Sequence, residues 1–305
     1  MQTLLSILTV HDGKPGHRAQ VEGLADAIGR LRGVLHVEHD TSAPEKTEGL
    51  LEKTPPRLVI CAGRKAAIPA AELAEAFGAK SVALMNPGWL KRRLFNLVVA
   101  PRHDGLKECD RVLLTDGALN AIEPAPEAPL VQGLILVGGP SAHHLWDGAD
   151  LVAQLRWILE HSPGMRFHAT SSRRTPDATL SDLLQLSMDF KDTLQFTPST
   201  DTPRGWVAGQ LQACGTCWVS EDSVSMVYEA LSAGAATGLL RVPAKQKCFG
   251  LRGPGRVVRG VRDLAVRRKV TTFDDFAKGT PLARHAPMQE ADRIAAEILR
   301  LWPEM

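Results

Sequence analysis

The stretch that decides the fold is residues 216–240, which read TCWVSEDSVSMVYEALSAGAATGLL. A short apolar run at 217–219 ends at three polar residues. Apolar positions then recur at helical spacing until Gly234, a residue type that commonly ends helices. A second apolar run begins at Thr237. The segment therefore predicts a strand, a tight loop, a helix and a second strand.

In an open parallel sheet, the loop of such a unit lies at the carboxyl end of the strand, where doubly wound folds bind their ligands. Asp222 or Ser223 is suited to cap the helix, and the free amides of its first turn form an anion site. Glu229 lies two turns further along and can carry a carboxylate toward a polar ligand. In the alternative interpretation, Glu221 and Asp222 only cap the helix and Glu229 is solvated.

The composition is that of a globular protein, and 305 residues are enough for two domains. A net charge of +2 predicts no general nucleic-acid-binding surface. No apolar run approaches the roughly 18 residues of a membrane span, and the N-terminus lacks the basic region of a signal peptide. We therefore expect a cytoplasmic protein.

The five cysteines include one CxxC pair, Cys214 and Cys217. A structural zinc site needs a second pair, or histidines at ligand spacing, and neither follows. The sequence predicts that these cysteines pack in the core and that no metal is bound.

The first half opens with a predicted buried strand at 3–10, a loop reading HDGKPGH at 11–17, and a helix at 20–31. The loop is neither a GxGxxG motif nor a phosphate-binding P-loop. It offers close backbone approach at Gly13 and Gly16, and a cation at Lys14. Histidine titrates near neutral pH, so His17 is a candidate general base, with a surface or helix-capping role as the alternative.

Strand and helix patterns alternate through the rest of the chain and predict parallel sheets covered by helices. The predicted strands are 58–61, 81–85, 97–101, 112–115, 134–137, 166–169 and 194–196, and the predicted helices are 66–77, 149–160, 176–186, 205–213 and 289–301. A proline-rich stretch at 123–129 interrupts this alternation as a linker. We expect an α/β fold of two Rossmann-like domains, 1–128 and 129–305, facing across a cleft. The last helix is able to pack back on the first domain.

The segment WLKRRLF at 89–95 mixes basic and large apolar side chains. It is a candidate for contact with a membrane surface or a lipid acceptor. The favoured interpretation is a short amphipathic turn that packs on the sheet with its arginines in water.

Several segments together resemble the elongated-mitochondria (mitochondrial fission) family, whose fold is similar to GT-B glycosyltransferases. They are HDGKPGH with Gln20, LVICAGRK, NPGWLKRRLFNLVVAPRHD, LVGGPSAHHLW, TSSRRTP and SEDSVSMVYEALSAG. The resemblance covers residues 10–240 and implies a glycosyltransferase that uses a nucleotide-diphosphate sugar without metal or cofactor. Its acceptor would be unknown, with lipid-linked and envelope glycans as candidates. One departure is Gly88, where related sequences place an arginine.

The resemblance also assigns site residues. On the donor side, Arg173 and Arg174 would neutralise the diphosphate and Glu229 would bind the ribose. The phosphates and donor sugar would face Glu221, Asp222, Ser223, Ser225 and Met226. The loops around phosphate or acceptor would include Gly138, Gly139, Ser171 and Ser172. On the acceptor side the cleft would be lined by Gly13, Lys14, Gly16 and His17.

Two questions stay open at this level. Glu221 and Glu229 stand eight residues apart, like the paired glutamates of some retaining GT-B enzymes, whereas His17 as base implies an inverting enzyme, which we favour. The alternative functions are a non-catalytic partner-binding protein of the mitochondrial-fission type and a nucleotide-sugar epimerase. An NAD-type oxidoreductase is disfavoured because no GxGxxG follows a strand.

Overall fold

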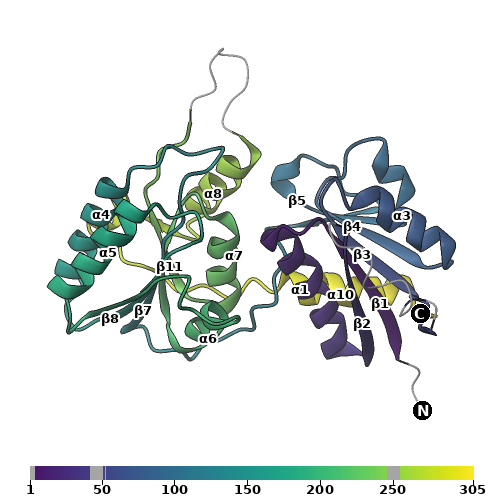
Figure 1. Ribbon diagram of the computed structural model, residues 1–305, viewed down its shortest axis with the longest axis horizontal. Coiled ribbons are helices and arrows are strands. Elements are labelled where there is room, and N and C mark those ends of the chain that lie inside the picture. Colours follow the sequence, from purple (N-terminus) through teal and green to yellow (C-terminus); the bar gives the residue numbers. More distant parts are fainter. Residues whose placement is uncertain (1–3, 42–50, 52, 246–254) are drawn as a thin grey trace. The chain divides into compact units, whose positions relative to one another are not determined.

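The computed structural model describes residues 4–41, 51, 53–245 and 255–305. The chain forms two compact units: unit 1 comprises Met1–Ala121 with Gln289–Met305, and unit 2 comprises Ile122–Met288. Each contains a six-stranded parallel sheet with helices on both faces (Figure 1). This is the α/β class, with two Rossmann-like sheets, that the alternating pattern predicts.

The unit 1 sheet has the strand order β2-β1-β3-β4-β5-β6. Its strands are β1 (Leu5–His11), β2 (Val34–Asp40), β3 (Leu58–Ala62), β4 (Lys80–Leu84), β5 (Leu97–Pro101) and β6 (Val112–Thr115). Its helices are α1 (Pro15–Leu31), α3 (Ala67–Ala76) and α10 (Glu290–Leu301), with the short 3-10 turns η2 (Lys91–Leu94) and η3 (Arg102–Asp104).

Alternate residues of β1 serve two different cores, because successive side chains of a strand point to opposite faces. Leu5 and Ile7 pack with α1 and α10, whereas Leu8 and Val10 pack with α3. This double burial explains why the strand is an almost unbroken apolar run in the sequence.

The unit 2 sheet has the strand order β12-β11-β10-β7-β8-β9. Its strands are β7 (Gln132–Leu136), β8 (Arg166–Thr170), β9 (Leu194–Thr197), β10 (Thr216–Ser220), β11 (Ala236–Leu240) and β12 (Thr271–Thr272). Its helices are α4 (Gly148–Glu160), α5 (Asp177–Asp189), α6 (Trp206–Ala213), α7 (Val224–Ala233), α8 (Arg256–Val266) and α9 (Phe273–Ala277). Helices α4 and α5 lie on one side of the sheet, and α6 and α7 lie on the other (Figure 1).

The segment 216–240 forms β10, α7 and β11 as predicted. Gly234 ends α7 in the left-handed conformation at φ 79°, which explains why a glycine occupies this position. Trp218 on β10 is paired with Gly238 on β11, and a Cβ at Gly238 would lie 2.4 Å from the indole ring. The glycine therefore lets the fully buried tryptophan lie against its neighbouring strand.

Three features differ from the sequence-based expectations. Helix α1 begins at Pro15 and not at residue 20, because proline fits the first turn of a helix, so Gly16 and His17 lie in that turn. Strand β2 was not predicted, because at an edge of the sheet it is only partly buried. The unit boundary lies at Ile122 and not at residue 129.

The proline-rich stretch is held by unit 2. The amide of Ala125 donates to the carbonyl of Ala233, and the Arg284 guanidinium donates to the carbonyls of Pro126 and Ala128. The expected linker is therefore an anchored part of unit 2, because its carbonyl groups find donors there. Helix α10 belongs to unit 1.

Candidate functional site

In unit 1 the candidate site lies directly after β1, where the chain turns into α1. The Asp12 carboxylate lies 2.6 Å from Nδ1 of His17 and 3.6 Å from Nζ of Lys14. Because an ionised carboxylate only accepts hydrogen bonds, Nδ1 of neutral His17 carries the proton and Nε2 is left with a free lone pair. Burial alone would raise the pKa of Asp12, but the His17 hydrogen bond and the Lys14 charge outweigh it and lower the pKa.

Gly63, which follows β3, closes this pair from the side. It has φ 101°, and a Cβ there would lie 2.6 Å from Nδ1 of His17 and 3.0 Å from the Asp12 carboxylate. Any larger residue would push the imidazole away from its carboxylate. The geometry is that of a carboxylate-oriented histidine, which is suited to act as a general base.

A second histidine fixes the loop itself. The amide of Gly13 donates to Nδ1 of His11, so the Nε2 proton of His11 faces Glu38 at 2.6 Å. Arg18 pairs with the same Glu38 at 2.8 Å. His11 is therefore a supporting residue, and this contact is part of what holds Gly13 at φ 74°.

In unit 2 the candidate site joins the ends of β7, β8 and β10. The buried Asp222 carboxylate accepts the amide of Gly139 at 3.0 Å and Nη2 of Arg174 at 2.8 Å. The hydroxyl of Ser220 accepts the amide of Gly138 at 2.8 Å. The other Asp222 oxygen, Oδ1, is buried without a hydrogen-bond partner.

The amides of the two glycines are used inside the unit, because they donate to Ser220 and Asp222. Their expected place in a loop around phosphate or acceptor stays a prediction. A Cβ at Gly138 would lie 2.3 Å from the Asp222 carboxylate, and one at Gly139 would lie 2.3 Å from the carbonyl of Arg174. These two positions need glycine because the loops approach each other too closely there for a side chain.

The paired arginines separate into two roles. Arg174 donates to the carbonyls of Gly139 and Pro140 as well as to Asp222, so its guanidinium ties three loops together. Arg173 is exposed and makes no ion pair with the residues that the structure describes. Of the two, only Arg173 therefore keeps its whole guanidinium for an incoming anion.

The serines before them accept hydrogen bonds from backbone amides. The Ser171 hydroxyl accepts the amide of Ser199 at 3.0 Å, and the Ser172 hydroxyl accepts the amide of Arg174 at 3.1 Å. Thr175, which the sequence analysis did not single out, donates its hydroxyl to the carbonyl of Gly138. The Thr175 contact fixes the loop after β8 to the loop after β7, and the Ser171 contact fixes it to the segment after β9.

The amino end of α7 is open. Ser223 occupies the cap position, but no side chain accepts a hydrogen bond from the first-turn amides, and Asp222 points to Gly139 and Arg174 instead. The expected capping by either side chain is therefore absent from the described contacts. Ser225 is exposed and Met226 half-buried in this first turn. Free amides at a helix amino terminus favour an anion.

One glutamate, Glu221, precedes this helix and another, Glu229, lies within it. Burial raises the pKa of Glu229 to about 7, and its carboxylate makes no hydrogen bond to the described residues. Burial also raises the pKa of Glu221, although the amide of Val242 donates to its carboxylate at 3.2 Å. Glu229 is therefore a half-buried carboxylate of unit 2 without a hydrogen-bond partner among the described residues.

Sequence reasoning missed two of these features. Asp12 stands inside the quoted HDGKPGH motif, and its five-residue spacing from His17 was a usable signal. The sequence did not predict that Asp12 lies beside Gly63, because Gly63 follows a different strand, β3. The link from Asp222 to Gly139 likewise spans residues far apart in the chain.

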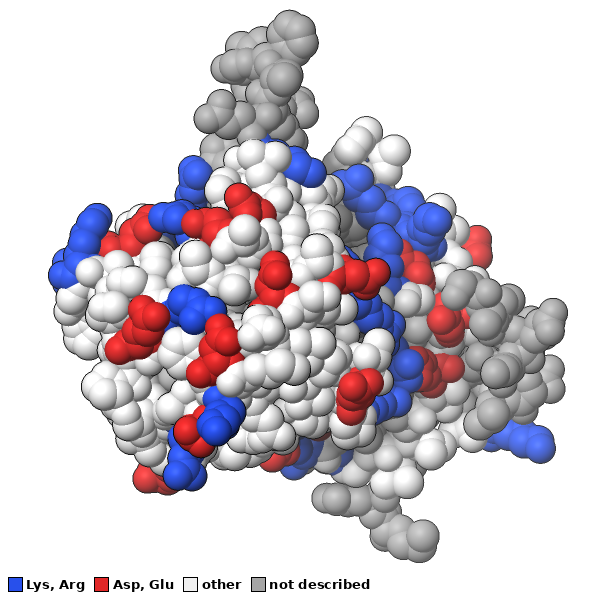
Figure 2. Space-filling model, turned by 60° about the vertical axis from the view of Figure 1, so that its left-hand side comes forward, with Lys and Arg blue, Asp and Glu red and all other residues white. Residues whose placement is uncertain are grey.

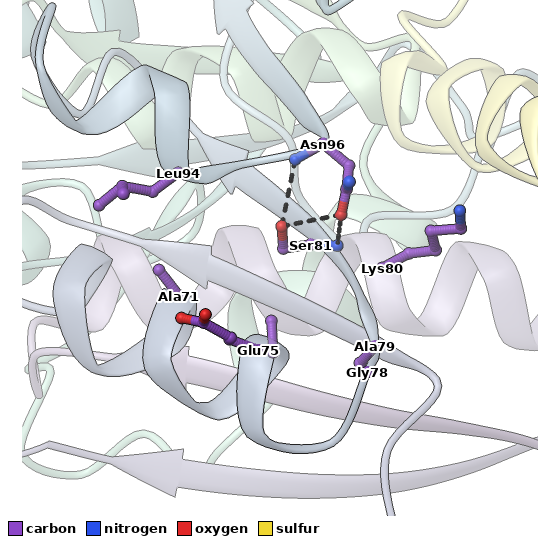
Figure 3. Close-up of a pocket in the computed structure, with 9 residues that line it drawn as sticks. Ala71, Glu75, Gly78, Ala79, Lys80, Ser81, Leu94 and Asn96 are labelled. Atoms are coloured by element: carbon purple, nitrogen blue, oxygen red, sulfur yellow. Dashed lines mark hydrogen bonds between the residues drawn. The ribbon is translucent and has the colours of Figure 1, made fainter.

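One cavity of unit 1 lies elsewhere. It measures about 420 Å³ and lies where β4 and β5 begin, beside Ser81 and Asn96 (Figure 3). There Oδ1 of Asn96 accepts the Ser81 amide at 2.8 Å. This is the amino end of the sheet, whereas Asp12 and His17 follow the carboxyl end of β1, so the cavity is separate from the candidate site.

Three further observations concern metal-binding groups, membrane-spanning helices and surface charge. Within the described ranges, no group of three His, Cys, Asp or Glu side chains is placed to hold a metal ion. Nor is any helix in that part of the chain long and apolar enough to cross a membrane. Basic and acidic side chains are interspersed over much of the face shown in Figure 2, as expected from the small net charge.

The cysteines fit their predicted packing role. Cys61, Cys214 and Cys217 are buried, and burial raises the pKa of Cys61 to about 12 and that of Cys214 to about 11. Such thiols are poor nucleophiles. Cys109 is exposed, and Cys248 lies outside the described residues.

Comparisons with known proteins identify the fold. UDP-GlcNAc 2-epimerase from Methanocaldococcus jannaschii superposes with a TM-score of 0.56 at 10% identity, over 97% of this chain and 100% of that one. Acinetobacter baumannii MurG gives 0.54 at 12% identity, over 99% and 100%. The UDP complex of S. aureus MnaA gives 0.52 at 11% identity, over 99% and 98%. These likenesses confirm a GT-B-like fold of two Rossmann-type domains.

A search of curated proteins found no match to this sequence. The family model described as Mitochondrial fission ELM1 matches residues 15–302, nearly the whole chain. The chain therefore belongs to the Mitochondrial fission ELM1 family.

Proposed function

We propose that this protein is a glycosyltransferase that moves a sugar from a nucleotide-diphosphate donor to an acceptor hydroxyl. The observation that carries the proposal is the open amino end of α7 together with the unpartnered carboxylate of Glu229 on the same helix. Solved proteins of this fold include a complex with UDP and enzymes named for UDP-GlcNAc, which favours a nucleotide-sugar ligand.

In the proposed donor site, the diphosphate lies at the first-turn amides of α7 and is neutralised by Arg173. The Glu229 carboxylate accepts hydrogen bonds from the two ribose hydroxyls, an arrangement that its lack of other partners allows. Arg174 and Asp222 hold the surrounding loops. The helix amides and Arg173 would neutralise the diphosphate, as a bound metal ion does in other enzymes. For this reason we predict that the reaction needs no metal.

In the proposed reaction, Nε2 of His17 takes the proton of the acceptor hydroxyl while Asp12 stabilises the imidazolium. The acceptor oxygen then bonds to the anomeric carbon, and the bond from that carbon to the diphosphate breaks and releases the nucleotide diphosphate. A single displacement of this kind inverts the anomeric centre. The Asp12 contact is the reason that we favour inversion over a retaining mechanism through Glu221 and Glu229.

An epimerase is the second candidate, because structures of UDP-GlcNAc 2-epimerases share the fold at TM-scores above 0.5. Product analysis separates the two. A transferase releases nucleotide diphosphate in proportion to glycosylated acceptor, whereas an epimerase yields an isomerised nucleotide sugar with no acceptor present. A protein that acts only through partners would bind neither nucleotide nor sugar nucleotide.

Calorimetric titration with UDP, GDP and their sugars tests the donor site. We expect one of them to bind, and Glu229→Ala to weaken that binding about 10- to 100-fold through the lost charge-assisted hydrogen bonds. Glu160→Ala, at the exposed end of α4, is the matched control and should leave binding unchanged. If none binds at millimolar concentration, the donor assignment is wrong.

Nucleotide release in the presence of an acceptor tests the base. His17→Ala and Asp12→Asn should each slow turnover about 10²- to 10⁴-fold without changing donor affinity, because the lost function is proton transfer. Turnover that survives both substitutions would remove His17 from the mechanism and leave the glutamates as candidates.

A further inference from the structure

A second surface of unit 1 is unusual for its exposed apolar side chains. Between β4 and β5 the chain exposes Trp89, Leu90 and Leu94 by 66%, 61% and 52%. Only Phe95 of the large apolar residues in this segment is buried. The favoured interpretation, an amphipathic turn packed on the sheet, therefore holds for Phe95 alone. We call this surface, residues 89–94, the Trp89 patch.

Hydrogen bonds connect the turn that carries the Trp89 patch to neighbouring parts of unit 1. The amide of Arg92 donates to the carbonyl of Gly88 at 3.0 Å, and Nζ of Lys91 donates to the carbonyl of Arg64 at 2.8 Å. Arg111, next to β6, donates to the carbonyl of Phe95, the residue that anchors the turn. The apolar tips are thus presented on a fixed scaffold.

Beside the exposed tips lies a cavity of about 260 Å³ with a strongly basic lining. Its lining comprises Trp89, Arg92, Arg93, Val98, Arg111 and Val112. No carboxylate among the described residues forms an ion pair with any of its three arginines. Nε of Arg92 is buried and has no hydrogen-bond partner. A buried, unpaired donor that shares a cavity with two further guanidinium groups favours an anionic acceptor.

We propose that the Trp89 patch and this cavity bind the surface of an anionic phospholipid membrane. Tryptophan and leucine tips enter the interface between headgroups and acyl chains, and the cavity takes a headgroup phosphate on Arg92, Arg93 and Arg111. Arginine suits this task because its planar fork binds phosphate oxygens in pairs.

Exposed apolar side chains beside an arginine-lined cavity favour a membrane over other partners. A phosphate on a soluble molecule would satisfy the arginines but would leave the apolar tips in water. An apolar protein partner would cover the tips but would leave the buried Nε of Arg92 unpaired. An anionic bilayer supplies both an apolar phase and phosphates within one surface.

This inference does not depend on the proposed glycosyl transfer, because it is tested without nucleotide. The assay is co-sedimentation of the full chain with vesicles of phosphatidylglycerol and phosphatidylcholine, compared with vesicles of phosphatidylcholine alone. We expect binding to the anionic vesicles that falls with added salt. Arg92→Gln with Arg93→Gln should weaken it about 30-fold, from the loss of two charges near the surface.

Matched variants make the result specific. Lys191→Gln with Lys278→Gln removes the same charge from exposed positions of unit 2 and should have little effect. Trp89→Ser should weaken vesicle binding at least about tenfold, whereas Met188→Ser, equally exposed on α5, should not. Circular dichroism confirms that each variant is folded.

Three outcomes would overturn the proposal. The first is equal binding to both kinds of vesicle. The second is unchanged binding in the arginine variant. The third is binding of inorganic phosphate or glycerol phosphate in the cavity without any vesicle binding, which would make it a site for a soluble anion.

Discussion

Glu229 shows how one side chain can be costly to the fold and useful to a ligand. Burial raises its pKa from 4.5 to about 7. The unfolded chain therefore loses this proton at lower pH than the folded one, and the free energy of unfolding falls as pH rises from about 4.5 to 7. Above pH 7 the penalty is complete and constant.

The prediction at this scale is that Glu229→Gln stabilises the protein, because the amide has no charge to desolvate. The gain in the free energy of unfolding should be roughly 2 kcal/mol larger at pH 8 than at pH 5. Urea unfolding of both proteins at the two pH values measures it. A gain that does not change with pH would mean that the carboxylate is already solvated.

The loops after β7, β8 and β10 act as one element because Asp222 lies between them. Asp222→Ala would leave the amide of Gly139 and part of the Arg174 guanidinium without an acceptor, so we expect the free energy of unfolding to fall by about 2–3 kcal/mol. Arg173→Ala should change it by less than about 0.5 kcal/mol, because Arg173 has no partner to lose.

Thermal and urea unfolding of these two variants compare their free energies of unfolding. Donor titration compares their affinities for the sugar nucleotide. Arg173→Ala should weaken binding of the sugar nucleotide while leaving stability intact. If instead Arg173→Ala destabilises unit 2 and Asp222→Ala does not, the roles assigned to the two residues are reversed.

For the whole molecule, the notable feature is that the end of the chain completes the first unit. Ile294 and Ile298 of α10 are buried against the core that α1 shares with β1. Polar contacts also fix the helix: Arg30 pairs with Asp292 at 2.6 Å, and Arg293 donates to the carbonyl of Leu114 at 2.6 Å. Unit 1 therefore includes a helix that follows all of unit 2 in the sequence.

Ile298→Ala should lower the free energy of unfolding of unit 1 by about 2–5 kcal/mol, because it leaves a cavity in a closed core. Amide hydrogen exchange measures this loss of stability separately for each region of the chain. We expect the amides of α1 and β1 to lose protection. Leu186→Ala, in the core of unit 2, is the control and should reduce protection in α5. Unchanged protection of α1 would show that α10 is not essential to unit 1.

The sequence by itself determined the α/β class and most of the strands and helices, although it predicted none of α8, β12 and α9. Residues 216–240 are an example: the spacing of apolar residues and the single Gly234 specify a strand, helix and strand, because these are effects of neighbouring residues. The same local signals placed the candidate loops after strand ends. They failed at β2, whose edge position leaves a weak apolar pattern, and at Pro15, which begins a helix that was expected at residue 20.

Only the tertiary structure decided which of those loop residues have partners. Arg173 and Arg174 are neighbours of the same type, yet Arg174 meets Asp222 while Arg173 is left exposed. His17 acquires its fixed orientation from Asp12 and from Gly63, which follows another strand, β3. Such contacts depend on how strands far apart in the chain are brought together, and no periodicity along the sequence encodes that distance.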